Sequence, residues 1–128
     1  MTNRKRIKSP LTKRAKRGFR GYPVATIALY GPDDRVATKA AVGIVEEEHG
    51  EATVLERWFA ETGDIRSDLG AANEMLAFIK EHGARTVVIT DRIIGCPHEE
   101  GVDYPEGEAC PDCPFWAGRD RWTSESLN

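Results

Sequence analysis

Three successive segments of the chain are rich in the β-branched, aromatic and other apolar residues that favour β-strands. They are Tyr22 to Tyr30, Thr38 to Val45 and Ala52 to Ala60. Gly31-Pro32-Asp33-Asp34 follows the first segment and predicts a tight turn, because Pro suits its first central position. The polar residues 46–51 predict a second turn. Short connections join antiparallel strands, so the pattern predicts a three-stranded antiparallel meander.

The apolar spacing then changes to that of a helix. Residues 64–68 offer N-cap side chains, Gly83 ends the pattern, and the apolar positions between them are Ala72, Met75, Leu76 and Ile79. Thr86 to Thr90 is a short, continuously apolar, β-branched run, which predicts a fourth strand in the interior of the sheet. The element order is therefore β-β-β-α-β. We predict an α+β fold with one helix packed on the sheet.

The chain divides by composition into three parts. We expect a disordered basic arm over residues 1–20, an α+β core over 21–95, and a zinc-binding loop with an aromatic and basic tail over 96–128. The 128 residues are 40% hydrophobic, enough for one core. No apolar run approaches the roughly 20 residues of a membrane helix, and the basic start lacks the apolar stretch of a secretory signal. We expect a cytoplasmic protein.

All three cysteines lie close together and share their segment with one of the three histidines. The set is Cys96, His98, Cys110 and Cys113. Three thiolates and one imidazole fill the tetrahedral shell that Zn²⁺ prefers and leave no position for water. Gly101, Pro105 and Gly107 allow the backbone between the two pairs to fold back around one ion. The spacing predicts a structural zinc site.

Two resemblances and one alternative bear on the same residues. Cys110-Pro111-Asp112-Cys113 resembles the knuckle of zinc ribbons and rubredoxin-like sites, which implies backbone N–H groups directed at a thiolate. The same run, taken with His98-Glu99-Glu100, resembles the motifs of zinc-dependent deaminases, which implies a catalytic zinc with Glu99 or Glu100 as the proton shuttle. A redox dithiol at Cys110 and Cys113 is the third interpretation.

The order of elements also resembles the first part of ribonuclease-H-like domains. That family places acidic residues on its first strand, first helix and fourth strand to hold catalytic divalent metals. Glu74 on the predicted helix and Asp91 after the last strand match two of these places, whereas Tyr22 to Tyr30 contains no acid. The resemblance implies at most a degenerate nuclease.

Charge is distributed very unevenly along the chain. Nine of the eighteen basic residues lie in the first twenty: Arg4, Lys5, Arg6, Lys8, Lys13, Arg14, Lys16, Arg17 and Arg20. No acid precedes Asp33. Residues 21–128 hold the other nine basic residues and all twenty-one acidic residues, so their net charge is −12. A basic arm of this kind releases counterions from phosphate backbones when it binds them. The charge pattern therefore favours nucleic acid as the partner, and RNA over DNA. A solvated tail and an organelle transit peptide are the alternatives.

Aromatic and basic residues also alternate after the cysteines. Phe115 and Trp116 are expected to cover the zinc loop as a hydrophobic lid, whereas Trp122, Arg119 and Arg121 have the composition of a base-stacking surface. The hypothesis is therefore a small zinc-binding protein that engages RNA or a ribonucleoprotein through its basic arm, with no catalytic role required. The alternatives are a zinc-dependent hydrolase or deaminase, a degenerate nuclease, and an acidic adaptor for a protein partner.

Overall fold

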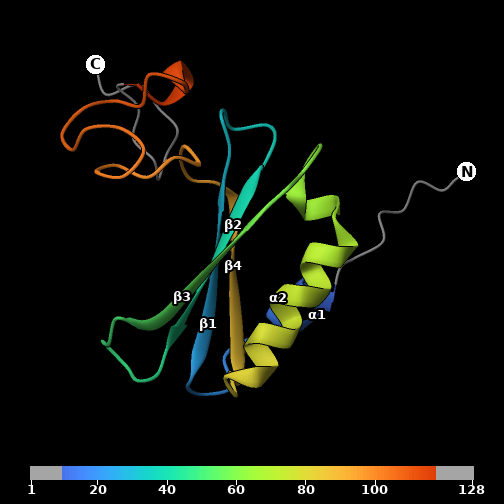
Figure 1. The fold of residues 1–128 in the computed structure, drawn as a ribbon. Helices are drawn as coiled ribbons and strands as arrows, with labels where there is room; N and C mark the ends of the chain where they lie inside the picture. Colours follow the sequence, from blue (N-terminus) through green and yellow to red (C-terminus); the bar gives the residue numbers. More distant parts are fainter. Residues whose placement is uncertain (1–9, 118–128) are drawn as a thin grey trace, which may run out of the picture.

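The computed structural model describes residues 10–117 and contains one four-stranded mixed sheet (Figure 1). Its strands are β1 (Val24–Tyr30), β2 (Lys39–Val45), β3 (Ala52–Phe59) and β4 (Thr86–Ile93). They lie in the order β3-β2-β1-β4, with β1–β2 and β2–β3 antiparallel. The predicted α+β class and the antiparallel meander are confirmed.

The fourth strand differs from the prediction in place and length. It pairs in parallel with β1, with Ile89 beside Ile27, and therefore forms an edge of the sheet instead of its interior. It also continues past Thr90 to Ile93, across an irregularity in the pairing with β1. Its apolar run reflects helices on one face, which bury Val87, whereas Val88 on the other face is 50% exposed.

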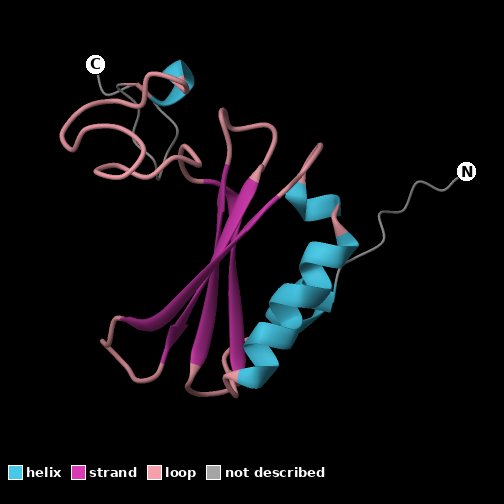
Figure 2. Ribbon diagram, viewed as in Figure 1, coloured by secondary structure: helices cyan, strands magenta, loops and turns pink. Residues whose placement is uncertain are grey.

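Helix α2 (Leu69–Glu81) covers one face of the sheet (Figures 1 and 2). Asp68 caps it, accepting a hydrogen bond from the Ala71 N–H at 3.0 Å, because the first turn of a helix leaves N–H groups unpaired. The helix packs on the sheet as predicted, and its buried side chains join one core with β1 and β2: Ala72, Met75, Ile79, Ala25, Ile27, Leu29, Ala40, Val42 and Ile44. Of the helices in the described residues, none has the length and apolarity that a bilayer crossing requires.

The basic arm is ordered over part of its length. Residues Pro10–Ala15 form helix α1, which packs beside α2 and β4. Leu11 is only 6% exposed and belongs to the core, and the Arg14 guanidinium donates to the Ala84 carbonyl at 3.2 Å. The expectation of disorder through residue 20 therefore does not hold here, because one apolar side chain and one carbonyl contact anchor this stretch. Residues 1–9 lie outside the described part.

The sheet face opposite the helices is lined by small residues and carries exposed apolar side chains at its margins. Ala41 and Gly43 occupy β2, and the exposed side chains are Leu55, Phe59 and Val88. Lys39 and Arg57 share this face, because residues two apart on a strand point the same way. This open face therefore brings charged residues of β2 and β3 to the end of the sheet where the loop after β4 lies.

Acid should weaken the contact that Asp64 makes between the β1–β2 loop and the residues that precede α2. This carboxylate accepts hydrogen bonds from Arg66 and from the Ala37 N–H, and chiefly the Arg66 side chain lowers its pKa from 3.8 to about 2. A lowered folded-state pKa stabilises the fold above about pH 4, by about 1–2 kcal/mol after allowance for partial exposure, and this is lost toward pH 2.

The measurement is urea unfolding of the wild-type protein and the Asp64→Asn variant at pH 7 and pH 2.5. The difference in unfolding free energy should fall to less than about half at the lower pH. Loss of metal in acid affects both proteins and cancels in the difference. Asp34→Asn, at an exposed position of the neighbouring loop, is the control. An Asp64→Asn difference that does not change with pH would contradict the assignment.

Candidate metal centre

The loop that carries the cysteines begins as a continuation of β4. The Ile94 N–H donates to the Leu29 carbonyl, and the Gly31 N–H donates to the Gly95 carbonyl, both at 2.9 Å. These bonds hold residues 94–95 beside the end of β1. Cys96 therefore leaves the sheet at a fixed position, at the end where the loop lies in Figure 1.

The four predicted ligands come together at this end of the sheet. Their donor atoms all lie within 4.8 Å of one another. The His98 Nδ1 atom lies 3.3, 3.4 and 3.5 Å from the three sulfurs, those of Cys96, Cys110 and Cys113 in turn. Tetrahedral Zn²⁺, with Zn–S near 2.3 Å and Zn–N near 2.05 Å, separates nitrogen from sulfur by about 3.6 Å. The cluster is positioned for metal binding, with Nδ1 as the histidine ligand atom.

Burial makes a cation necessary if these thiols are to ionise. Cys96, Cys110 and Cys113 are 5%, 7% and 2% exposed. Loss of solvent raises the pKa of the Cys113 thiol, and the neighbouring thiols raise it further. Burial likewise raises the pKa of Cys96. A reactive redox thiol needs a lowered pKa instead, so this environment suits a metal better than a dithiol switch.

Backbone groups around the first ligand pair support the thiolate. The His98 N–H lies 3.2 Å from the Cys96 sulfur and donates to it. This N–H···S bond is at the first ligand pair, whereas the resemblance to a knuckle placed such a bond at Cys110. The Gly101 N–H donates to the Tyr104 carbonyl at 2.8 Å and closes the turn that follows. Gly101 and Gly107 have φ values of 84° and 87°, which favour glycine, so these bends depend on residue type.

The two aromatic residues after Cys113 lie against the cluster. They belong to the short 3₁₀ helix η2 (Pro114–Trp116). Trp116 is 9% exposed, packs in the same core as the cysteines, and donates from its indole to the Gly31 carbonyl at 2.8 Å. Phe115 packs edge-on against it, with ring centroids 4.9 Å apart. The two rings therefore pack in and against the core that holds the cysteines, and Trp116 ties η2 to the loop after β1.

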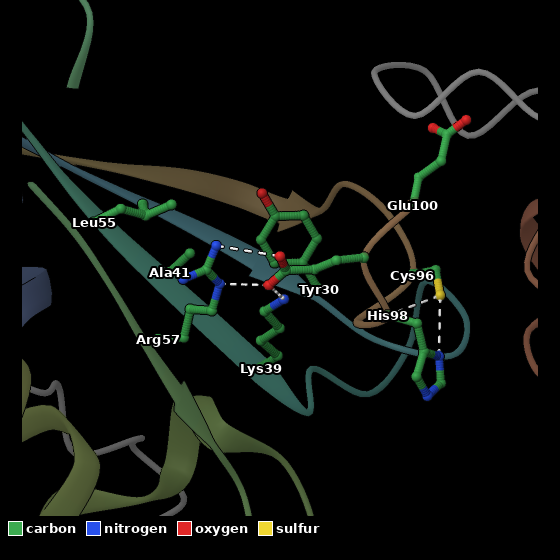
Figure 3. A pocket seen from close by; sticks show the side chains of 9 residues that line it. Tyr30, Lys39, Ala41, Leu55, Arg57, Cys96, His98 and Glu100 are labelled. Atoms are coloured by element: carbon green, nitrogen blue, oxygen red, sulfur yellow. Dashed lines mark hydrogen bonds and ion pairs between the residues drawn. The ribbon is translucent and has the colours of Figure 1, made fainter. Parts of the chain in front are cut away.

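A cavity of about 280 Å³ lies between the loop that carries the cysteines, here called the metal loop (residues 96–117), and the open face of the sheet (Figure 3). Its lining includes Lys39 and Arg57 from the sheet and His98 and Glu99 from the loop. The Glu99 carboxylate pairs with both cations, and the hydrogen bond from Lys39 is the main reason its pKa is lowered. Neither Lys39 nor Arg57 was a candidate from the sequence, because no local pattern distinguishes them from other surface cations.

Three of the acids that the resemblances single out, Glu99, Glu100 and Glu74, have partners elsewhere. Glu99 is held as a carboxylate, whereas a proton shuttle needs a pKa near the working pH. Glu100 points away from Cys96 and His98 (Figure 3) and accepts from the Gly107 N–H at 2.6 Å. Glu74 accepts from the Trp58 indole at 3.0 Å. The geometry therefore favours a filled metal shell over deaminase-like or nuclease-like chemistry.

Comparisons with other proteins found no relative of this chain. No protein-family model, curated protein or solved structure matches the chain.

The basic residues predicted to meet nucleic acid are only partly described. Lys13 and Arg14 lie on α1, and Lys16, Arg17 and Arg20 follow it. The others lie outside the described residues: Arg4, Lys5, Arg6, Lys8, Arg119, Arg121 and Trp122. Sequence reasoning passed over Phe19, which is 68% exposed between these cations and packs edge-on against Tyr22 at 5.5 Å. Its position in the basic segment, between Gly18 and Arg20, was the sequence signal that could have identified it.

Proposed function

We propose that this chain is a small zinc protein in which one structural Zn²⁺ closes the loop 96–117 onto the end of the sheet. The observation that carries the proposal is the convergence of one imidazole nitrogen and three buried sulfurs at the separations of a tetrahedral shell. Thiolate and imidazole ligands select zinc over the hard cations Mg²⁺ and Ca²⁺. Four protein ligands leave no position for a reacting water, so the ion acts on folding.

We further propose that the basic N-terminal region binds single-stranded RNA. Lys13, Lys16, Arg17 and Arg20 are exposed, whereas the Arg14 guanidinium contacts a backbone carbonyl. Phe19 lies exposed among them and provides a ring on which a base can stack. Support for this role comes from the density of cations, the absence of acids before Asp33 and this exposed aromatic ring.

Charge removal tests the RNA proposal without deleting α1, whose Leu11 is part of the core. The variant Lys13→Gln/Lys16→Gln/Arg17→Gln is compared with Arg35→Gln/Lys80→Gln/Arg92→Gln, three exposed cations elsewhere. Binding of a labelled mixed-sequence 20-nucleotide RNA is measured by fluorescence anisotropy at several salt concentrations. The protein is first confirmed to carry one zinc per chain by native mass spectrometry.

The first variant should weaken binding about 10–100-fold at low salt and reduce the slope of log affinity against log salt by about 2, because about three phosphate contacts are lost. Phe19→Ala should cost about 1–3 kcal/mol with little change in slope. Equal effects of the two triple variants, or no RNA binding by the zinc-loaded wild type, would overturn the proposed role.

A further inference from the structure

Lys39 is a buried cation at the start of β2, directly below the metal loop. Its side chain is 5% exposed. The ammonium donates to the Glu99 carboxylate at 3.0 Å and to the Pro97 carbonyl at 2.9 Å. The rings of Tyr30 and Phe59 lie 5.3 and 5.6 Å from it, within cation–π range. These partners hold the ammonium in one position, since a buried charge is stable only where it is paired.

Arg57 on β3 holds the same carboxylate from the neighbouring strand. Its Nη2 donates to Glu99 Oε1 at 3.2 Å, and its Nε pairs with Oε2, which also accepts from Lys39. Arg57 lies opposite Ala41 in the β2–β3 register, two residues along from Lys39. A fork of guanidinium donors on two carboxylate oxygens fixes orientation as well as distance. Side chains from two adjacent strands, β2 and β3, therefore hold the Glu99 carboxylate.

Contacts from the sheet reach the residues immediately before and after one of the proposed metal ligands, His98. Pro97 and Glu99 are the immediate neighbours of His98, so the backbone carbonyl before this ligand and the side chain after it are both tied to the sheet. His98 is also the ligand whose Nδ1 contacts all three sulfurs. Groups beyond the ligands that orient a metal-bound histidine strengthen metal binding when they are held rigidly.

We infer that the ion cluster of Lys39, Glu99 and Arg57 positions His98 for the metal and couples zinc affinity to strands β2 and β3. This inference rests on the proposed zinc site, and it assigns Lys39 and Arg57 as positioning residues. Neither contacts the donor atoms. Their effect passes through the backbone of residues 97–99, which the paired ammonium and guanidinium keep in the orientation that points Nδ1 at the sulfurs.

The test is the zinc affinity of Lys39→Met, measured by competition with a chromophoric chelator of known affinity at constant pH. Met keeps the length and apolar stem of Lys but cannot donate to Pro97 or Glu99. We expect zinc binding to weaken about 10–100-fold. Lys80→Met, the same change at an exposed position of α2, should leave the affinity unchanged.

Arg57→Gln provides a second variant, because its side chain is 38% exposed and its loss threatens the fold less. Zinc binding should weaken about 3–10-fold, and Arg57→Lys, which keeps the charge, should recover part of the loss. Co²⁺ substituted for Zn²⁺ reports ligand geometry directly, so its visible d–d bands should shift in Arg57→Gln and not in Lys80→Met. A merely destabilised sheet would leave these bands in place.

These measurements distinguish failure of the proposed metal site from failure of the positioning role. If the wild-type chain binds no zinc, the proposed metal site is overturned and the inference falls with it. If the wild type binds one zinc while Lys39→Met and Arg57→Gln keep its affinity and its Co²⁺ spectrum, the metal site stands and the positioning role is overturned.

Discussion

Replacing Cys113 with Ser is expected to abolish tight zinc binding and to open the loop between Cys96 and Trp116. Cys113 is 2% exposed, and its sulfur lies 3.5 Å from the His98 Nδ1 atom. A structural zinc contributes about 10–16 kcal/mol of apparent binding free energy, and loss of one thiolate should remove at least about 4 kcal/mol of it, about 10³-fold in affinity. Co²⁺ titration measures this directly through the thiolate charge-transfer bands.

The control and a second cysteine make this result specific. Asp112→Asn changes an exposed side chain between Cys110 and Cys113 and should bind zinc as the wild type does. Cys96→Ser should lose the metal as Cys113→Ser does, because a closed four-ligand shell uses all its members. A Cys96→Ser variant that retained tight zinc would indicate an open three-ligand centre instead. Zinc binding should also weaken as the pH falls, since burial raises the pKa of the Cys96 and Cys113 thiols and protons then compete with the metal.

Gly31→Ala is expected to destabilise the fold by about 3 kcal/mol or more, because the clash is with backbone that no rotamer change relieves. A Cβ atom at this position would lie 1.9 Å from the Val36 carbonyl oxygen. Gly31 also donates to Gly95 and accepts from the Trp116 indole, so displacing it disturbs the anchoring of the metal loop. Urea unfolding of the zinc-loaded protein, with the slope checked for change, measures the loss.

Gly18→Ala is the matched control for this substitution. Apart from Gly18 itself and its two chain neighbours, no heavy atom lies within 4 Å of its Cβ position, but its φ of 78° is unfavourable for alanine. The cost should therefore be only about 1–2 kcal/mol. Gly31 does not have a positive φ, so the clash with Val36 is the only one of these two causes that acts there. A Gly31→Ala cost no larger than that of Gly18→Ala would contradict the predicted clash of about 3 kcal/mol or more.

Local pattern was sufficient for most of the secondary structure. The three antiparallel strands begin and end within two residues of the prediction, because runs of β-favouring residues and short polar turns are properties of neighbouring residues. Asp64 and Asp68, within the predicted cap region, both accept the capping hydrogen bonds, at 2.9 and 3.0 Å. The chemistry of a cap needs only residues a few positions away.

The metal cluster was also accessible from the sequence, for a different reason. Cysteine and histidine are side chains that bind zinc, and their spacing places all four ligands within one short loop. The donor atoms converge as that spacing predicts. The identity of the four ligand residues and the short loop that joins them were together enough to predict the site.

Three features depended on the tertiary structure. The placement of β4 at the sheet edge is set by its pairing with β1 across the α2 crossover, and the order of Pro10–Ala15 depends on Leu11 finding a place in the core. The pairing of Lys39 with Glu99 joins residues sixty positions apart. The sequence by itself determined the strands, the helix caps and the ligand set, because these follow from near neighbours. Only the tertiary structure decided which distant cations hold the metal loop, because long-range pairing depends on the packing of the whole sheet.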